Sequence, residues 1–139
     1  MGVATAIMRV SRLVSGAIDA ALRPLELSYA RFETLGILFF EPEGVLPLGK
    51  LSERLGVHPA TVTSIVDRLE QQDLVRRTRR EGDRRIVLAE LQPAGRELVQ
   101  RANDVIVREV LPKLELPKKD LDTLYRLLAD MRRSIGDFE

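Results

Sequence analysis

The chain has 139 residues and a formal net charge of +1, with 45% hydrophobic residues and no cysteine. This length suits one domain with a hydrophobic core, and the absence of cysteine excludes disulfide bonds, thiolate metal sites and cysteine nucleophiles. Because Arg9, Arg12 and Asp19 interrupt the apolar N-terminal positions, we expect neither a signal peptide nor a membrane span, but a cytoplasmic protein.

The first predicted helix spans residues 3–22, where apolar residues recur at alternating spacings of four and three. That spacing is close to the 3.5-residue repeat by which one helix packs along another. Pro24 ends the pattern, because proline disfavours helix in the residue before it. Ser28 is a suitable N-cap for a second helix, which ends before Pro42 and Gly44.

Two further helices and one strand are predicted between residues 45 and 72. The apolar segment 45–48 is typical of an edge strand, which tolerates its proline. A short helix at 50–55 ends at Gly56, and Pro59 suits the first turn of the next helix. The two helices, joined by a short turn, form a predicted helix-turn-helix.

After residue 73 the apolar period changes to about two, which predicts strands at 74–80 and 85–91 joined by a hairpin loop. Residues 74–85 contain six arginines against two acidic residues, a local charge of +4. Two helices follow, at 94–111 and 118–134, and the last carries apolar residues at heptad-like spacings. The predicted fold class is therefore mainly α with a small β-hairpin (α+β), organised as a winged helix-turn-helix.

A helix-turn-helix followed by an arginine-rich hairpin indicates binding to double-stranded DNA. The major groove admits one α-helix, and small or hydroxyl side chains near its N-terminus allow close approach to the bases. Arginines on the hairpin can contact phosphates or enter the minor groove. The expected recognition-helix contacts are His58, Pro59, Ala60, Thr61, Thr63, Ser64 and Arg68, and the expected wing contacts are Arg77, Arg79, Arg80, Arg84 and Arg85.

Other interpretations remain open. A winged helix can bind proteins through the same surfaces, although a protein partner does not require a local charge of +4. The heptad-like stripes could belong to an intrachain core, but we favour a homodimer interface, because so small a chain offers its terminal helices few internal partners. His58, the only histidine, suits a helix cap better than a metal ligand. No nucleophile or phosphate-binding loop accompanies the acidic residues, so we expect no enzyme, metal or cofactor.

The sequence resembles the multiple antibiotic resistance regulator (MarR) family over nearly its whole length, most clearly from Leu51 to Leu98. The resemblance rests on Thr61-Val62-Thr63, Asp67-Arg68-Leu69, Leu74-Val75, Asp83-x-Arg85 and Leu91-x-Pro93-x-Gly95. It implies a transcriptional regulator, with repression as the family-level expectation, that binds palindromic operators as a homodimer. It also implies a single domain 1–139, with dimerisation helices at 1–23 and 94–139 around a DNA-binding core at 28–92.

The resemblance also implies roles for particular residues. Asp67 and Asp83 would brace the wing through Arg68 or Arg85. A small-molecule signal would weaken DNA binding, and a small aromatic or anionic effector is the hypothesis for a pocket near the terminal helices, where the aromatic residues could equally be core. The residues assigned to this pocket are Arg12, Tyr29, Arg31, Phe32 and Phe39.

Overall fold

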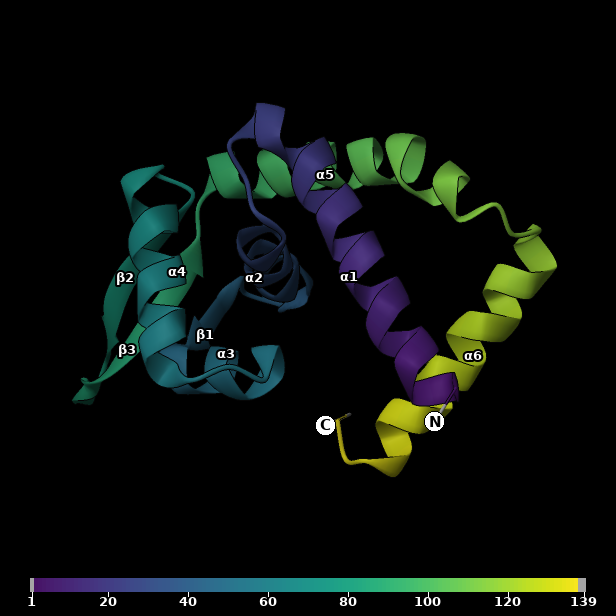
Figure 1. Ribbon diagram of the computed structural model, residues 1–139. Coiled ribbons are helices and arrows are strands. Elements are labelled where there is room, and N and C mark those ends of the chain that lie inside the picture. The colour runs from purple at the N-terminus through teal and green to yellow at the C-terminus, as the bar shows by residue number, and fades with distance from the viewer. Residues whose placement is uncertain (1, 138–139) are drawn as a thin grey trace.

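The structure, a computed structural model, describes residues 2–137 (Figure 1). This part of the chain is mainly helical and carries one small antiparallel sheet, which confirms the predicted fold class. Its elements in chain order are α1 (Gly2–Leu22), η1 (Arg23–Leu25), α2 (Tyr29–Phe40), β1 (Val45–Pro47), α3 (Leu48–Leu55), α4 (Pro59–Gln71), β2 (Val75–Arg80), β3 (Asp83–Leu91), α5 (Pro93–Glu109), η2 (Leu111–Leu114) and α6 (Lys118–Ser134).

The sheet has the strand order β1-β3-β2, and all pairings are antiparallel. β1 lies at one edge, as predicted, although the strand is shorter because Leu48 already begins α3. The hairpin is also tighter than the sequence predicted, since β3 begins at Asp83 and only residues 81 and 82 form the turn. Gly82 has a φ of 85°, a conformation that glycine adopts without steric strain.

The turn between α3 and α4 is built by local hydrogen bonds. Gly56 adopts a φ of 64°, and its N–H donates to the carbonyl oxygen of Glu53 at 3.2 Å. His58 Nδ1 accepts a hydrogen bond from the N–H of Ala60 at 3.1 Å, which caps α4, and Pro59 occupies the first turn. The helix-turn-helix predicted from Gly56 and Pro59 is therefore present.

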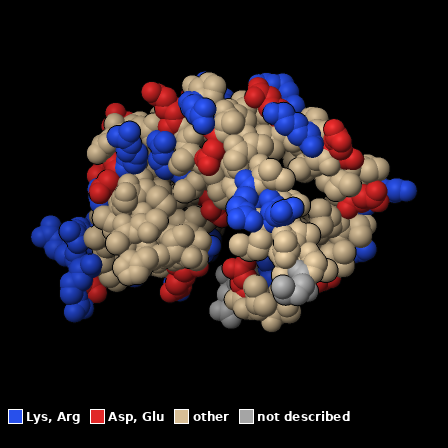
Figure 2. All heavy atoms as spheres, viewed as in Figure 1, with Lys and Arg blue, Asp and Glu red and all other residues tan. Residues whose placement is uncertain are grey.

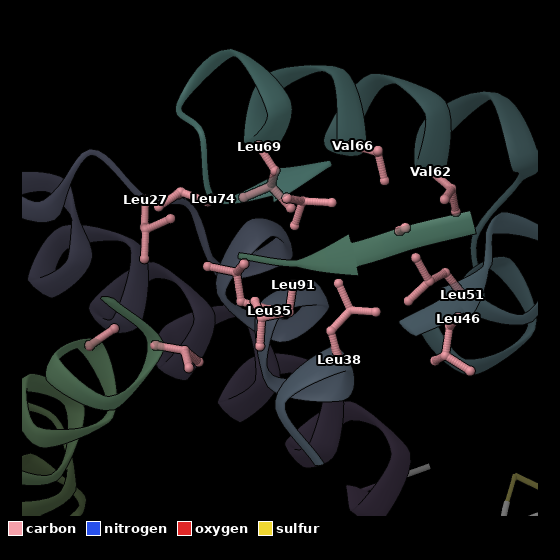
Figure 3. Close-up of a cluster of buried hydrophobic side chains, with 14 of the residues drawn as sticks. Leu27, Leu35, Leu38, Leu46, Leu51, Val62, Val66, Leu69, Leu74 and Leu91 are labelled. Atoms are coloured by element: carbon pink, nitrogen blue, oxygen red, sulfur yellow. The ribbon is translucent and has the colours of Figure 1, made fainter. Parts of the chain in front are cut away.

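The hydrophobic core lies between α2, α3, α4 and the sheet. Figure 3 shows leucine and valine side chains from these elements pointing toward one another. α4 contributes Val62, Val66 and Leu69, which are at most 1% exposed. Because these residues recur at spacings of four and three, they form one face of the helix. The opposite face of α4 is consequently turned to solvent.

Two backbone positions determine how α4 and α5 meet the sheet. Asp73 lies between α4 and β2 with a φ of 57°, in the left-handed region. Aspartate is one of the few residues other than glycine that tolerate this region. A Cβ atom added to Gly95 would overlap the carbonyl oxygen of Leu74 and lie 2.8 Å from Leu91 Cδ1. The start of α5 therefore contacts the sheet as closely as only glycine permits.

α1 and α6 lie on the side of the molecule away from the β2–β3 hairpin, and α5 extends from the end of β3 toward α6 (Figure 1). α5 contacts both α1 and α2, whereas most of α6 is exposed. The exposed large apolar residues of the two terminal helices are Val3, Ile7, Met8, Val10 and Leu13 on α1, and Leu124, Tyr125, Leu127, Leu128 and Met131 on α6. Within residues 2–137, no helix is both long and apolar enough to span a membrane.

Candidate DNA-binding surface

The exposed face of α4 carries the side chains expected to contact DNA. All seven are exposed, because the opposite face of the helix packs in the core: His58, Pro59, Ala60, Thr61, Thr63, Ser64 and Arg68. Thr63 Oγ1 donates to the carbonyl oxygen of Pro59 at 3.1 Å, and Arg68 Nη1 donates to Gln71 Oε1 at 3.2 Å. Thr61 and Ser64, in the first two turns of the helix, are exposed as well.

The tip of the β2–β3 hairpin, here called the wing tip, carries four exposed arginines: Arg79, Arg80, Arg84 and Arg85. Figure 2 shows a cluster of basic atoms at this end of the molecule. The side chain of Arg85 is 91% exposed and its Nε lies 3.1 Å from Asp83 Oδ1. Hydrogen bonds from Arg85 hold the pKa of the Asp83 carboxyl below its usual value. The structure thus pairs Asp83 with Arg85, one of the two partners expected for bracing.

Arg77 was expected to contact DNA, but its side chain is engaged with α4. It forms ion pairs with Asp67 and Glu70, and its backbone N–H donates to Glu70 Oε2 at 2.8 Å. The hydrogen bond to Asp67 raises the pKa of Arg77 further, which keeps its positive charge in place. Asp67 was expected to brace the wing through Arg68 or Arg85, but its partner is Arg77, whereas Arg68 bonds Gln71. The contacts of Arg77 join β2 to α4.

The sequence interpretation missed Glu70 and Gln72. Gln72 follows α4, where its Oε1 accepts a hydrogen bond from Arg31 Nη1 at 2.7 Å and its Nε2 donates to the carbonyl oxygen of Glu26 at 3.1 Å. The pKa of Arg31 is lowered, first by burial and then by the nearby charge of Arg68. These bonds join the C-terminal end of the recognition helix to the beginning of α2.

The predicted effector pocket is only partly assembled. A hollow of about 550 Å³ lies between α2 and α5, and Phe32 and Phe39 line it. The other three residues lie elsewhere: Arg31 binds Gln72, the Tyr29 backbone N–H donates to Asp19 Oδ1 at 2.6 Å, and Arg12 lies in a shallow depression on α1. The polar lining comes from Gln100, Asn103 and Asp104 on α5, which the sequence interpretation did not include.

Sequence and structure comparisons with known proteins point to one family. A sequence model of the MarR family matches residues 27–87. The chain is 34% identical to a MarR family transcriptional regulator from Streptomyces coelicolor, whose crystal structure superimposes with a TM-score of 0.89 over 100% of this chain and 96% of that one. CouR from Rhodococcus jostii RHA1, whose structure contains p-coumaroyl-CoA, is 25% identical, with a TM-score of 0.81 over 96% of this chain and 90% of that one.

The curated relatives are longer than the matched region. The chain is 36% identical over 95 residues to the HTH-type transcriptional regulator PecS from Dickeya dadantii, an alignment that spans 67% of this chain and 57% of PecS. Across three such relatives, the matched region covers more than half but less than two thirds of their length.

Proposed function

Since the chain belongs to the MarR family of transcriptional regulators, we propose that it regulates transcription by binding double-stranded DNA sequence-specifically as a homodimer. The observation that carries the proposal is the combination of an exposed recognition-helix face, rich in small and hydroxyl side chains, with four exposed arginines at the wing tip. A helix of this kind suits the major groove, while arginines at a wing tip suit phosphates or the minor groove. A cytoplasmic location belongs to the same proposal.

The dimer is supported by the apolar side chains that α1 and α6 expose within one chain. Burying them against a second copy removes apolar area from water, which favours association. We assign the interface to residues 1–23 and 94–139, and the DNA-binding core to residues 28–92. A twofold dimer presents its two recognition helices about 34 Å apart, or a multiple of that distance, and therefore reads an inverted repeat.

The first test is selection from randomised duplex DNA by the purified full-length protein at about 0.15 M salt. This physiological ionic strength weakens non-specific binding to phosphates. We expect enrichment of an inverted repeat. Retention without enrichment would identify a non-specific DNA-binding protein. No retention at low salt would contradict DNA binding and favour the alternative function, a winged-helix module that binds proteins.

The second test separates phosphate contacts from base contacts. Arg68→Ala should weaken binding to all sequences and reduce the slope of log K against log salt by ~0.9 for each phosphate that is no longer neutralised. Thr61→Ala should instead relax the sequence preference and leave the slope unchanged. Unchanged affinity and slope in Arg68→Ala would show that the assignment of Arg68 to phosphate is wrong.

We propose that the protein is a repressor, which blocks the promoter while it is bound and leaves the DNA when an effector binds to it. Support for an effector comes from the hollow between α2 and α5, which lies beside the helices assigned to the dimer interface. Its volume of about 550 Å³ is within the range of small-molecule sites.

A further inference from the structure

The hollow between α2 and α5 has an unusual floor, formed by Gly36 in the middle of α2. Glycine is among the least favourable residues in a helix interior. The fold does not require it here, since Gly36 is not among the glycines with positive φ and a Cβ added to it would meet no atom within 4 Å. What the missing side chain does is leave the hollow open.

The walls of the hollow are aromatic. Phe32, Phe39 and Phe40 line it from α2, and the rings of Phe39 and Phe40 meet edge to face with centroids 5.4 Å apart. Phe40 is 84% exposed, which is unfavourable for so large an apolar ring unless something covers it. Aromatic faces carry partial negative charge, so several rings together favour a cation.

The polar lining has the same electrostatic preference. It consists of the amides of Gln100 and Asn103 and the carboxylate of Asp104. The guanidinium of Arg96 packs over the Phe39 ring, with Cζ 5.0 Å from the ring centroid, and Arg96 is not among the lining residues. Among the described residues that line the hollow there is one carboxylate and no lysine or arginine, so the lining itself favours a cation over an anion.

We propose that the hollow binds a lipophilic organic cation, with an aromatic ring system over Gly36 between the phenylalanines and a positively charged nitrogen near Asp104. The chemistry differs from the anionic effector hypothesised with Arg12 and Arg31, because both arginines lie outside the hollow. An effect of this ligand on DNA binding rests on the function proposed above, whereas the binding itself does not.

The test is titration calorimetry of the full-length protein, without DNA and at neutral pH, with three probes of nearly equal shape: 1-naphthylmethylammonium, 1-naphthylmethanol and 1-naphthoate. We expect the cation to bind tightest and the carboxylate weakest, with about a two- to fivefold change in Kd at each step, as for partly exposed cation–π and ion-pair contacts. Tightest binding of the carboxylate, or no binding of the cation at millimolar concentration, would overturn the proposal.

Two pairs of variants locate the site. Gly36→Leu fills the hollow and should weaken binding of the cation at least tenfold, whereas Gly49→Leu, at another helical glycine with open space around it, should not. Asp104→Asn should reduce the preference for the cation over the alcohol, because only the contribution of the rings remains, whereas Glu97→Gln, at an exposed carboxylate on the same helix, should leave the preference intact. Wild-type affinity in Gly36→Leu or an undiminished preference for the cation in Asp104→Asn would contradict the assignment.

Gly36→Ala provides a check that does not depend on how well a leucine is accommodated. This variant should raise the melting temperature, because alanine is the better helix former, and still weaken binding of the cation. If the wild-type protein binds 1-naphthylmethylammonium but does not retain DNA, that result counts against the proposed function alone. If the wild-type protein retains DNA but does not bind 1-naphthylmethylammonium, that result counts against this inference alone.

Discussion

Gly95 illustrates how one missing side chain positions a helix. Any Cβ at this position overlaps the Leu74 carbonyl oxygen, which is backbone and cannot move aside. We therefore expect Gly95→Ala to lower the free energy of unfolding by about 2 kcal/mol or more, because overpacking against a rigid neighbour strains the structure. Gly49→Ala, where the added Cβ meets nothing within 4 Å, is the matched control in urea denaturation and should be neutral or slightly stabilising. Equal stability of the two variants would contradict the close approach.

Glu33 predicts a specific pH dependence of stability. Its pKa is raised above 4.5, chiefly by burial, with Asp137 adding to the shift and Arg132 opposing it. A raised pKa means that the folded state binds the proton more tightly than the unfolded state, so this contribution to stability is complete below the unfolded pKa and is lost as pH rises through the folded pKa. The charged carboxylate is thus destabilising at neutral pH.

The corresponding variant is Glu33→Gln, whose melting temperature at pH 7 should exceed that of the wild type. The difference should shrink as pH falls through the raised pKa of Glu33 and be gone below 4.5, where the wild-type carboxyl is protonated in both states. Asp83→Asn is the control of opposite sign, because the pKa of Asp83 is lowered by Arg85 and its contribution is lost as pH falls. A constant difference between Glu33→Gln and wild type across this range would exclude the titration of Glu33 as its cause.

At the scale of elements, the wing is joined to the recognition helix through Arg77. Arg77→Met keeps the aliphatic stem but removes the contacts with Asp67 and Glu70, and should lower the free energy of unfolding by about 1 kcal/mol, the value for a partly exposed charge network. Amide hydrogen exchange in β2 should accelerate. Arg76→Met removes a pair with Glu90 whose arginine side chain is 62% exposed, and should have a smaller effect. An equal loss of unfolding free energy in the two variants would show that the contacts of Arg77 with α4 stabilise the fold no more than the exposed pair of Arg76.

The sequence predicted most element positions because Ser28, Pro59 and Gly56 act locally, through caps and turns that depend on a few neighbouring residues. The roles of the wing arginines depend instead on the register in which β2 pairs with β3, which the sequence pattern does not specify. Six arginines look alike in the sequence, and only the pairing of Arg77 with Ala89 in the sheet places one of them beside α4. The hollow was half predicted for the same reason, since its α5 wall comes from residues more than 60 positions away from Phe32 in the chain.

For the whole molecule, the exposed apolar face of α6 predicts the state of association. Leu124→Glu combined with Leu128→Glu should convert the dimer to monomer in sedimentation velocity, because each leucine contributes about 1.5–3 kcal/mol when fully buried, or at least tenfold in the dissociation constant. Arg126→Glu, on the opposite face of the helix at 100° per residue, is the control and should remain dimeric. A dimeric double variant would exclude this face from the interface.

The strand order gives the wing arginines a second consequence, which concerns solubility. β2 lies at one edge of the sheet and β1 at the other, and four of the six residues of β2 are arginine. An unpaired edge can add a strand from another copy and so begin aggregation, and a row of like charges opposes that addition. Replacing several of these arginines at once removes this protection as well as the proposed contacts with phosphate. Loss of DNA binding in such multiple variants is therefore interpretable only when the protein remains monodisperse.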